Sequence, residues 1–228
     1  MSKYVINLPS IVALPILGSD ELFPVRRVYC IGRNYAAHAI EMGHDPDREP
    51  PFFFQKNPNN LDPSGEFPYP TNSTDVHYEA EVAVMLKSGG NNILIEEALD
   101  HVYGYALCLD MTRRDLQAAQ KKLGRPWEIG KAFERSAPVG PIHQVGNVGH
   151  FQSGVINLKV NDVLKQEGDL NQMIWKVPEM ISYLSDYFEL SGGDVILSGT
   201  PAGVGPVCKG DTMEVSANGL GILKVLVI

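Results

Sequence analysis

Apolar and polar side chains alternate along residues 76–85, a pattern typical of a strand with one face in a core. The residues of the apolar face are Tyr78, Ala80, Val82 and Val84. The opposite face carries His77, Glu79, Glu81 and Ala83. The two glutamates repel each other unless a positive charge, such as a divalent cation, lies between them. On this stretch alone, the simpler interpretation is the solvated face of an edge strand. The metal interpretation needs a third oxygen ligand and a catalytic group elsewhere in the chain.

Further short strands are predicted wherever a brief apolar run is bounded by turn residues. They cover residues 25–32, 52–56, 102–109, 155–160, 195–198, 213–216 and 221–228. Helices are predicted for residues 34–43, for residues 112–123, where Thr112 and Asp115 have capping-box spacing, and for residues 172–188. Residues 57–74 are predicted to form a long irregular loop, a kind of segment that is usually functional, and residues 124–141 another loop. Because helices and strands do not alternate regularly, a doubly wound parallel sheet is disfavoured. We expect a β-rich α+β fold with short peripheral helices.

The 228 residues suffice for one large domain or two small ones. We expect an N-terminal arm over residues 1–22, packed on the body or on a partner subunit, and one domain over residues 23–228 that forms the body. A net charge of −8 and the lack of a basic cluster with interleaved aromatics argue against a nucleic-acid partner. No apolar run approaches the roughly 20 residues that span a bilayer, and we see no secretory signal. Three well-separated cysteines fit a reduced compartment, so we expect a cytoplasmic protein.

Candidate chemistry centres on three acids. Asp110 ends a predicted buried strand just before a helix, a position from which a carboxylate can reach a site. With Glu79 and Glu81 it makes an all-oxygen ligand set, which suits Mg²⁺ or Mn²⁺, with Ca²⁺ as a further option. His38 and Glu41 are three residues apart and would project from one face of the predicted helix. The alternative for this pair is a surface contact of little value.

Five motifs follow one another along the chain: Gly32–Met42, His77–Glu81, Asp110–Gln117, Gly130–Phe133 and Ser198–Gly205. In sequence and in order they resemble the fumarylacetoacetate hydrolase family. The resemblance implies a mixed β-roll, a homodimer, and a divalent metal held by Glu79, Glu81 and Asp110. It also implies catalytic roles for three residues: His38, Glu41 and Lys131.

Within the family, residues 42–54 look most like bacterial fumarylpyruvate hydrolases. This likeness implies cleavage of a carbon–carbon bond in a small anionic 2,4-diketo acid, with fumarylpyruvate giving fumarate and pyruvate during aromatic (gentisate) catabolism. Relatives with the same core motifs are acylpyruvases, oxaloacetate decarboxylases and isomerases. A non-catalytic, metal-stabilised binding module of the same fold is the remaining alternative.

For hydrolysis, His38 oriented by Glu41 would activate the water, and Lys131 would stabilise an oxyanion or hold a carboxylate. The expected substrate-binding residues are Arg33, Gln117 and Thr200. A substrate with a second carboxylate also needs a cation at the far wall of its pocket, because an unpaired buried carboxylate is costly. The candidates for that cation are Arg33, Arg48 and Arg125, and the choice among them stays open. Arg33 ranks first for a role in substrate binding of some kind, which could instead be the near carboxylate.

Overall fold

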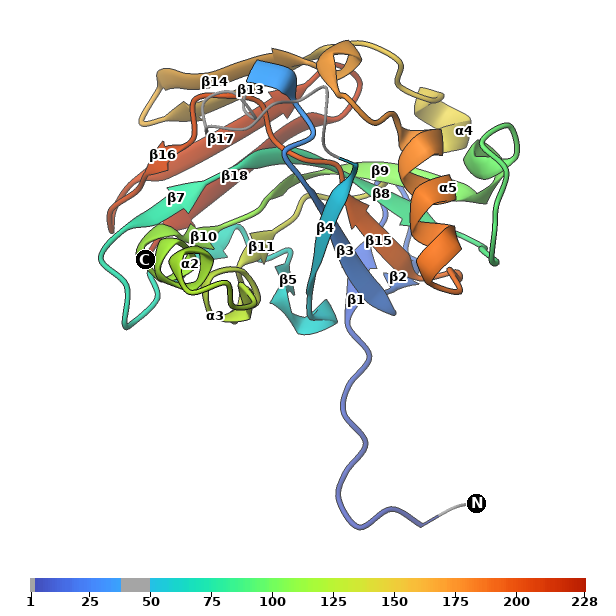
Figure 1. The fold of residues 1–228 in the computed structure, drawn as a ribbon, viewed down its shortest axis with the longest axis horizontal. Helices are drawn as coiled ribbons and strands as arrows, with labels where there is room; N and C mark the ends of the chain where they lie inside the picture. Colours follow the sequence, from blue (N-terminus) through green and yellow to red (C-terminus); the bar gives the residue numbers. More distant parts are fainter. Residues whose placement is uncertain (1–2, 38–49) are drawn as a thin grey trace.

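A computed structural model describes residues 3–37 and 50–228, and most of its strands lie in two sheets (Figure 1). The six-stranded sheet has the order β12 (His143–Gln144), β9 (Val102–Leu109), β8 (Ala80–Leu86), β15 (Asp194–Leu197), β3 (Arg27–Gly32) and β4 (Phe52–Lys56). The five-stranded sheet has the order β14 (Val163–Asp169), β13 (Val155–Val160), β17 (Thr212–Ala217), β18 (Gly221–Val227) and β6 (Glu66–Phe67). Smaller sheets join β1 (Ala13–Pro15) to β2 (Leu22–Pro24), β10 (Thr112–Arg113) to β7 (Val76–Tyr78) and β16 (Gly205–Pro206), and β11 (Ala137–Pro138) to β5 (Leu61–Asp62).

The helices are short and peripheral. They are α2 (Arg114–Lys122), α3 (Glu128–Lys131), α4 (Val145–Val148) and α5 (Val177–Tyr187), with 3₁₀ turns η1 (Pro58–Asn60), η2 (Ala98–His101) and η3 (Leu170–Gln172). Helices α2 and α3 lie together on one side of the molecule and α5 on the other (Figure 1). Among the described residues, no helix is long and apolar enough to cross a membrane. The β-rich α+β fold with short helices that the sequence predicts is confirmed.

The central strands of the six-stranded sheet are buried on both faces, because their side chains alternate between two cores. Tyr29 and Ile31 of β3 belong to the larger core, which the sheet shares with the five-stranded sheet. Val28 and Cys30 point into a second core that the β1–β2 hairpin helps to cover. Every residue of β8 is buried, and β8 pairs with β9 on one side and β15 on the other. The interpretation of residues 76–85 as a solvated edge strand is therefore wrong.

Several predicted elements need correction. The predicted strand over residues 76–85 is interrupted at Glu79, which separates β7 from β8. The loop predicted for residues 57–74 contains η1, β5 and β6, and the latter two pair in parallel with the distant strands β11 and β18. The loop predicted for residues 124–141 contains α3 and β11, and β14 was not predicted at all. Most of the helix predicted for residues 34–43 lies outside the described residues.

The two other predicted helices begin later than expected. Helix α5 starts at Val177, with Pro178 in the first turn, where a missing N–H costs no hydrogen bond. Helix α2 starts at Arg114, so Thr112 and Asp115 do not form the predicted capping box. The carboxylate of Asp115 instead accepts hydrogen bonds from the Ser73 hydroxyl (2.7 Å) and the Thr74 N–H (3.0 Å). It thereby ties the segment before β7 to the start of α2.

Candidate metal centre and its cavity

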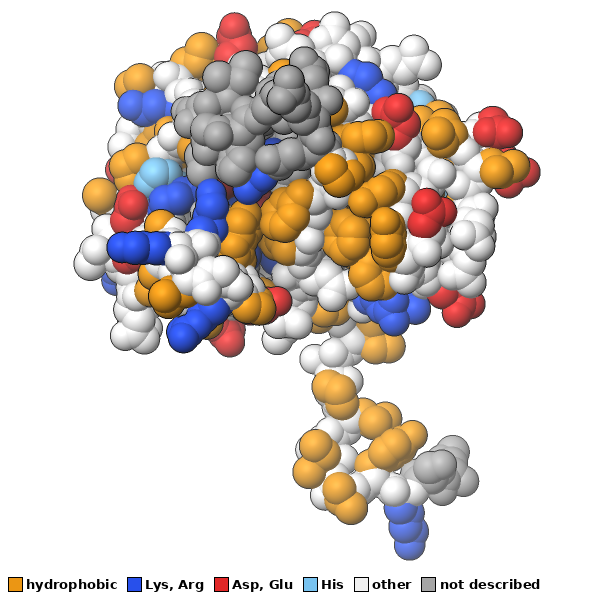
Figure 2. Space-filling model, in the orientation of Figure 1, with side chains coloured by type: hydrophobic (Ala, Val, Ile, Leu, Met, Phe, Trp, Pro, Cys, Tyr) orange, Lys and Arg blue, Asp and Glu red, His pale blue; other side chains and the backbone are white. Residues whose placement is uncertain are grey.

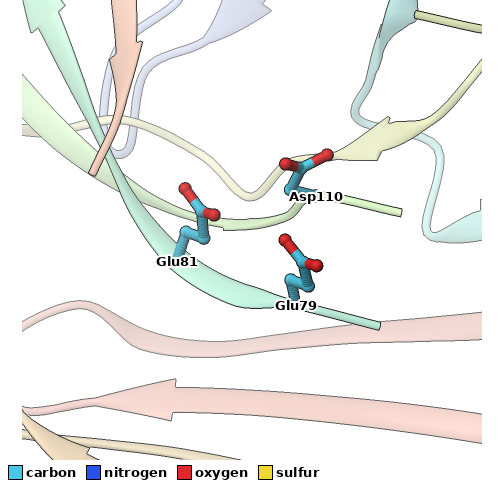
Figure 3. A group of neighbouring side chains, drawn as sticks. All are labelled: Glu79, Glu81 and Asp110. Carbon is cyan, nitrogen blue, oxygen red and sulfur yellow. The ribbon is translucent and has the colours of Figure 1, made fainter. Parts of the chain in front are cut away.

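Three buried carboxylates converge where β8 and β9 meet. Glu79 precedes β8, Glu81 is its second residue, and Asp110 follows β9 directly. The antiparallel register pairs Ala80 with Leu109, and the Asp110 N–H donates to the Glu79 carbonyl at 2.8 Å. One oxygen from each acid lies within 4.8 Å of the others, and Figure 3 shows the three groups pointing toward a common space. The exposed fractions of Glu79, Glu81 and Asp110 are only 6%, 2% and 1%.

Lys131 and Arg114 neutralise part of this negative charge. The Lys131 Nζ lies 2.8 Å from Glu79 Oε2 and 2.7 Å from Asp110 Oδ2, so it bridges two of the acids. Arg114 Nη2 lies 2.6 Å from Glu79 Oε1. Burial alone would lower the pKa of Lys131, but the charges of Asp110 and Glu79 outweigh burial and raise it. Lys131 therefore remains a cation that holds two carboxylates in place.

A second buried lysine, Lys56, supports the centre and was missed by the sequence analysis. Its Nζ lies 2.9 Å from Asp110 Oδ1. It also donates hydrogen bonds to the Ser136 hydroxyl (2.9 Å), the Met111 carbonyl (3.3 Å) and the Lys131 carbonyl. The available signal was a lysine that ends the aromatic run of β4, where a charged side chain needs a partner.

Glu81 is compensated differently from the other two acids. Its Oε2 accepts a hydrogen bond of 2.9 Å from the Gly199 N–H, and no lysine or arginine in the described part of the chain pairs with it. Burial, followed by the charges of Asp110 and Glu79, raises the pKa of Glu81 well above its usual value. Gly199 has φ 93°, and a Cβ there would lie 2.7 Å from the Asn34 Cβ. Only glycine therefore suits the turn that presents this N–H.

These residues fit a hard divalent cation. The donor set is made of carboxylate oxygens, which Mg²⁺, Mn²⁺ and Ca²⁺ prefer, and it contains no histidine or cysteine. A bound cation would also supply the positive charge that the buried Glu81 lacks, while Lys131, Arg114 and Lys56 already hold the other two acids. The sequence-predicted ligands are thus brought together by the fold.

A cavity opens beside the three acids, and cationic and aromatic side chains line much of its wall. All three predicted substrate-binding residues, Arg33, Gln117 and Thr200, line it. Arg33 has φ 60°, and its guanidinium lies 5.5 Å from the centre of the Phe52 ring. The hydroxyl of the buried Thr200 accepts a hydrogen bond of 2.9 Å from the Gln166 amide. Gln166, which also binds the Ala80 N–H at 3.0 Å, was not predicted.

The remaining residues proposed from the sequence for catalysis or substrate binding are not placed at the cavity. His38, Glu41 and Arg48 lie outside the described residues. Arg125 is exposed and does not line the cavity. Lys121 and Trp127, neither of which was proposed for the site, both line the cavity.

The fold and the acid cluster correspond to a known family. The family model Fumarylacetoacetate (FAA) hydrolase C-terminal matches residues 27–228, so the chain belongs to the fumarylacetoacetate hydrolase family. The structure is similar to that of fumarylpyruvate hydrolase from Pseudomonas aeruginosa, solved with Mn²⁺ and pyruvate, with a TM-score of 0.97, 50% identity and coverage of 99% of both chains.

Two other relatives carry different activities in their names. The mitochondrial oxaloacetate decarboxylase of Dictyostelium discoideum is 37% identical, over 86% of this chain and 90% of the relative. The oxaloacetate tautomerase YcgM of Escherichia coli K12 is 38% identical, over 86% of this chain and 90% of the relative. Of these three relatives, the Pseudomonas aeruginosa enzyme was solved with Mn²⁺, and the three names give different reactions on fumarylpyruvate or oxaloacetate.

Proposed function

We propose that this protein is a metal-dependent hydrolase that converts fumarylpyruvate and water into fumarate and pyruvate in the breakdown of an aromatic acid. The observation that carries the proposal is a cavity with three convergent acids at one end and cationic residues along its wall. The 50% identity to the Pseudomonas aeruginosa enzyme, over 99% of the chain, supports this particular substrate.

In this proposal, Glu79, Glu81 and Asp110 hold the metal, which is Mg²⁺ or Mn²⁺. When bound, the metal supplies Lewis acidity for the negative charge that develops on the pyruvate fragment. Lys131, which bridges Glu79 and Asp110, keeps the two carboxylates at a fixed separation and brings a positive charge to the same end of the cavity. Fixed charges of this kind act without reorganisation during the reaction.

The water-activating group is His38, oriented by Glu41. The imidazole takes a proton from water as the oxygen attacks the 4-keto carbon of the substrate. The bond between carbons 3 and 4 then breaks, its electron pair stays with the pyruvate fragment, and carbon 3 takes up a proton. Arg33, Gln117 and Thr200 bind and orient the substrate in the cavity that they line.

Purified protein assayed with Mn²⁺ or Mg²⁺ against fumarylpyruvate, acetylpyruvate and oxaloacetate tests this function. We expect pyruvate release, measured by coupling to lactate dehydrogenase, to be fastest with fumarylpyruvate and to disappear in Glu81→Gln. A preference for acetylpyruvate would make the protein a general acylpyruvase. Metal binding without turnover of any substrate would indicate a binding module.

Oxaloacetate tautomerisation is the second candidate function, and the 38% sequence identity to the tautomerase YcgM favours it. Tautomerisation needs no hydrolytic water. A His38→Ala variant that tautomerises oxaloacetate as fast as the wild type would therefore support this alternative. Loss of the enol absorbance of oxaloacetate without release of CO₂ distinguishes the tautomerase from a decarboxylase.

We also propose that the protein is a homodimer in which residues 3–11 contact the partner subunit. These residues extend away from the body (Figure 1), and all of them are exposed. Five of them are large and apolar: Tyr4, Val5, Ile6, Leu8 and Ile11. Light scattering should give a dimer for the wild type and a weaker dimer when these five residues are replaced by serine, whereas an unchanged mass over a dilution series would remove the arm's role.

A further inference from the structure

One face of α2 runs along the cavity from the acid cluster to a lysine. Arg114, Gln117 and Lys121 all line the cavity, and their spacing of three and four residues places them in a row on the helix. Arg114 marks the inner end, because it pairs with Glu79 at 2.6 Å. At 1.5 Å per residue, Lys121 lies about 10 Å further along the helix axis. The row therefore connects the metal end of the cavity with a cation at a distance from it.

The surroundings of Lys121 are cationic and aromatic. Its Nζ lies 5.6 Å from the centre of the Trp127 ring, and it makes no ion pair with any carboxylate in residues 3–37 and 50–228. Partial burial, with the nearby charges of Arg33 and Arg114, lowers the pKa of Lys121. Figure 2 shows lysine and arginine side chains gathered on the side of the molecule where α2 lies, beside hydrophobic ones. Arg114 already has Glu79 as its anion, and an anion bound beside Lys121 would further reduce the repulsion among these cations.

A purely structural role explains this lysine less well. A cation in the last turn of a helix stabilises the helix dipole, and both Lys121 and Lys122 occupy that turn. Lys122 is exposed and does not line the cavity, whereas Lys121 is half-buried and does. The dipole accounts for the presence of both charges but not for the placement of one of them against Trp127 inside the cavity.

We propose that Lys121 binds the second carboxylate of an elongated dianionic substrate whose diketo end lies at Glu79, Glu81 and Asp110. Phe54 and Trp127, whose ring centres are 6.0 Å apart, line the cavity as well and offer an apolar wall to the carbon chain. This inference rests on the proposed function and assigns its substrate specificity. Oxaloacetate is three carbons shorter than fumarylpyruvate and would hold its second carboxylate nearer the metal end, whereas the conjugated chain of fumarylpyruvate extends its second carboxylate toward Lys121.

The test compares Lys121→Met with Lys122→Met, a control that removes the same charge from the same helix turn outside the cavity. Kinetics are measured with Mn²⁺ on fumarylpyruvate and on acetylpyruvate, which has a methyl group in place of the distal chain. A charge-assisted hydrogen bond is worth about 1.5–3 kcal/mol, so Lys121→Met should raise the KM for fumarylpyruvate about 10-fold or more. The KM for acetylpyruvate should change less than about twofold, Lys121→Arg should recover most of the loss, and Lys122→Met should match the wild type.

The outcomes separate this inference from the proposed function. Suppose that the wild type hydrolyses both substrates. If Lys121→Met then leaves both KM values unchanged, or raises the KM for fumarylpyruvate and for acetylpyruvate equally, the assignment of Lys121 is overturned while the hydrolase function stands. If the wild type hydrolyses neither, the hydrolase function fails, and calorimetry of fumarylpyruvate binding to the Mn²⁺-loaded protein decides on Lys121. In that case a 10-fold weaker affinity in Lys121→Met supports the site, and an equal affinity overturns it. Circular dichroism melts of both variants establish that they fold.

Discussion

Replacing Lys56 by methionine should destabilise the protein strongly, although Lys56 is not expected to touch the substrate. Methionine has a similar length and keeps the apolar stem, so the change mainly removes the charge. The side chain of Lys56 is fully buried, and its Nζ lies 2.9 Å from Asp110 Oδ1. Without it, one buried carboxylate oxygen loses its cation and the Ser136 hydroxyl loses a hydrogen-bond donor.

The expected magnitude follows from the contacts that remain. Removing one partner of a buried ion pair costs about 3–5 kcal/mol, because the other charge stays buried and uncompensated. Asp110 keeps a second cation, Lys131, at 2.7 Å. We therefore expect the lower end, a loss of about 3 kcal/mol, which for a chain of this size lowers Tm by about 6–12 °C.

Urea unfolding followed by circular dichroism, at one protein concentration and with chelator present, measures this loss. Lys159→Met, on an exposed position of β13, is the matched control and should change the free energy of unfolding by less than about 0.5 kcal/mol. If the loss of stability arises from the uncompensated charge of Asp110, it should be smaller where that charge is absent. In an Asp110→Asn background, Lys56→Met should therefore lower the free energy of unfolding by at least about 1 kcal/mol less than in the wild type. A loss below 0.5 kcal/mol in the single variant, or the same loss in both backgrounds, would refute the reasoning.

Three further predictions address the site. His38→Ala should lower hydrolysis by about 10²-fold or more while calorimetric Mn²⁺ binding persists; loss of binding would instead make His38 a ligand. Gly130→Ala should lower both Tm and kcat, because its Cβ would lie 3.0 Å from the Gln117 Cα and push α3 away from α2; an unchanged melt would contradict this packing. Mn²⁺ at 100 times its Kd should raise the free energy of unfolding by about 2.7 kcal/mol, and a shift retained in Glu81→Gln would contradict the three-carboxylate centre.

The sequence predicts those parts of the structure whose cause is local. Strands β4, β9 and β13 have the predicted bounds, because each is an apolar or alternating run between turn residues. Strands β5 and β6 are only two residues long and exist because they pair with partners far along the chain, so no local periodicity marks them. Pairing between distant segments can override local preference in this way.

The same distinction applies to the site. The acids could be found because two share a strand face and one ends a buried strand. Lys56 could not be assigned, because its partners Asp110 and Ser136 follow 54 and 80 residues later in the chain, a spacing without a pattern. Lys121 was overlooked for another reason: a lysine in the last turn of a helix is ordinary, and only the fold shows that it faces a cavity.

The position of β15 in the six-stranded sheet has a consequence for how the chain is made. Strand β15 lies between β8 and β3 and pairs with both, yet it is the last strand of that sheet along the sequence. On the ribosome, the pairs β3–β4 and β8–β9 emerge long before the strand that joins them. During that interval β3 and β8 each present an open edge, the feature through which strands of separate chains associate. Nascent chains are therefore most exposed to aggregation until residue 197 has emerged, and the Gly199 N–H that binds Glu81 arrives only after that point.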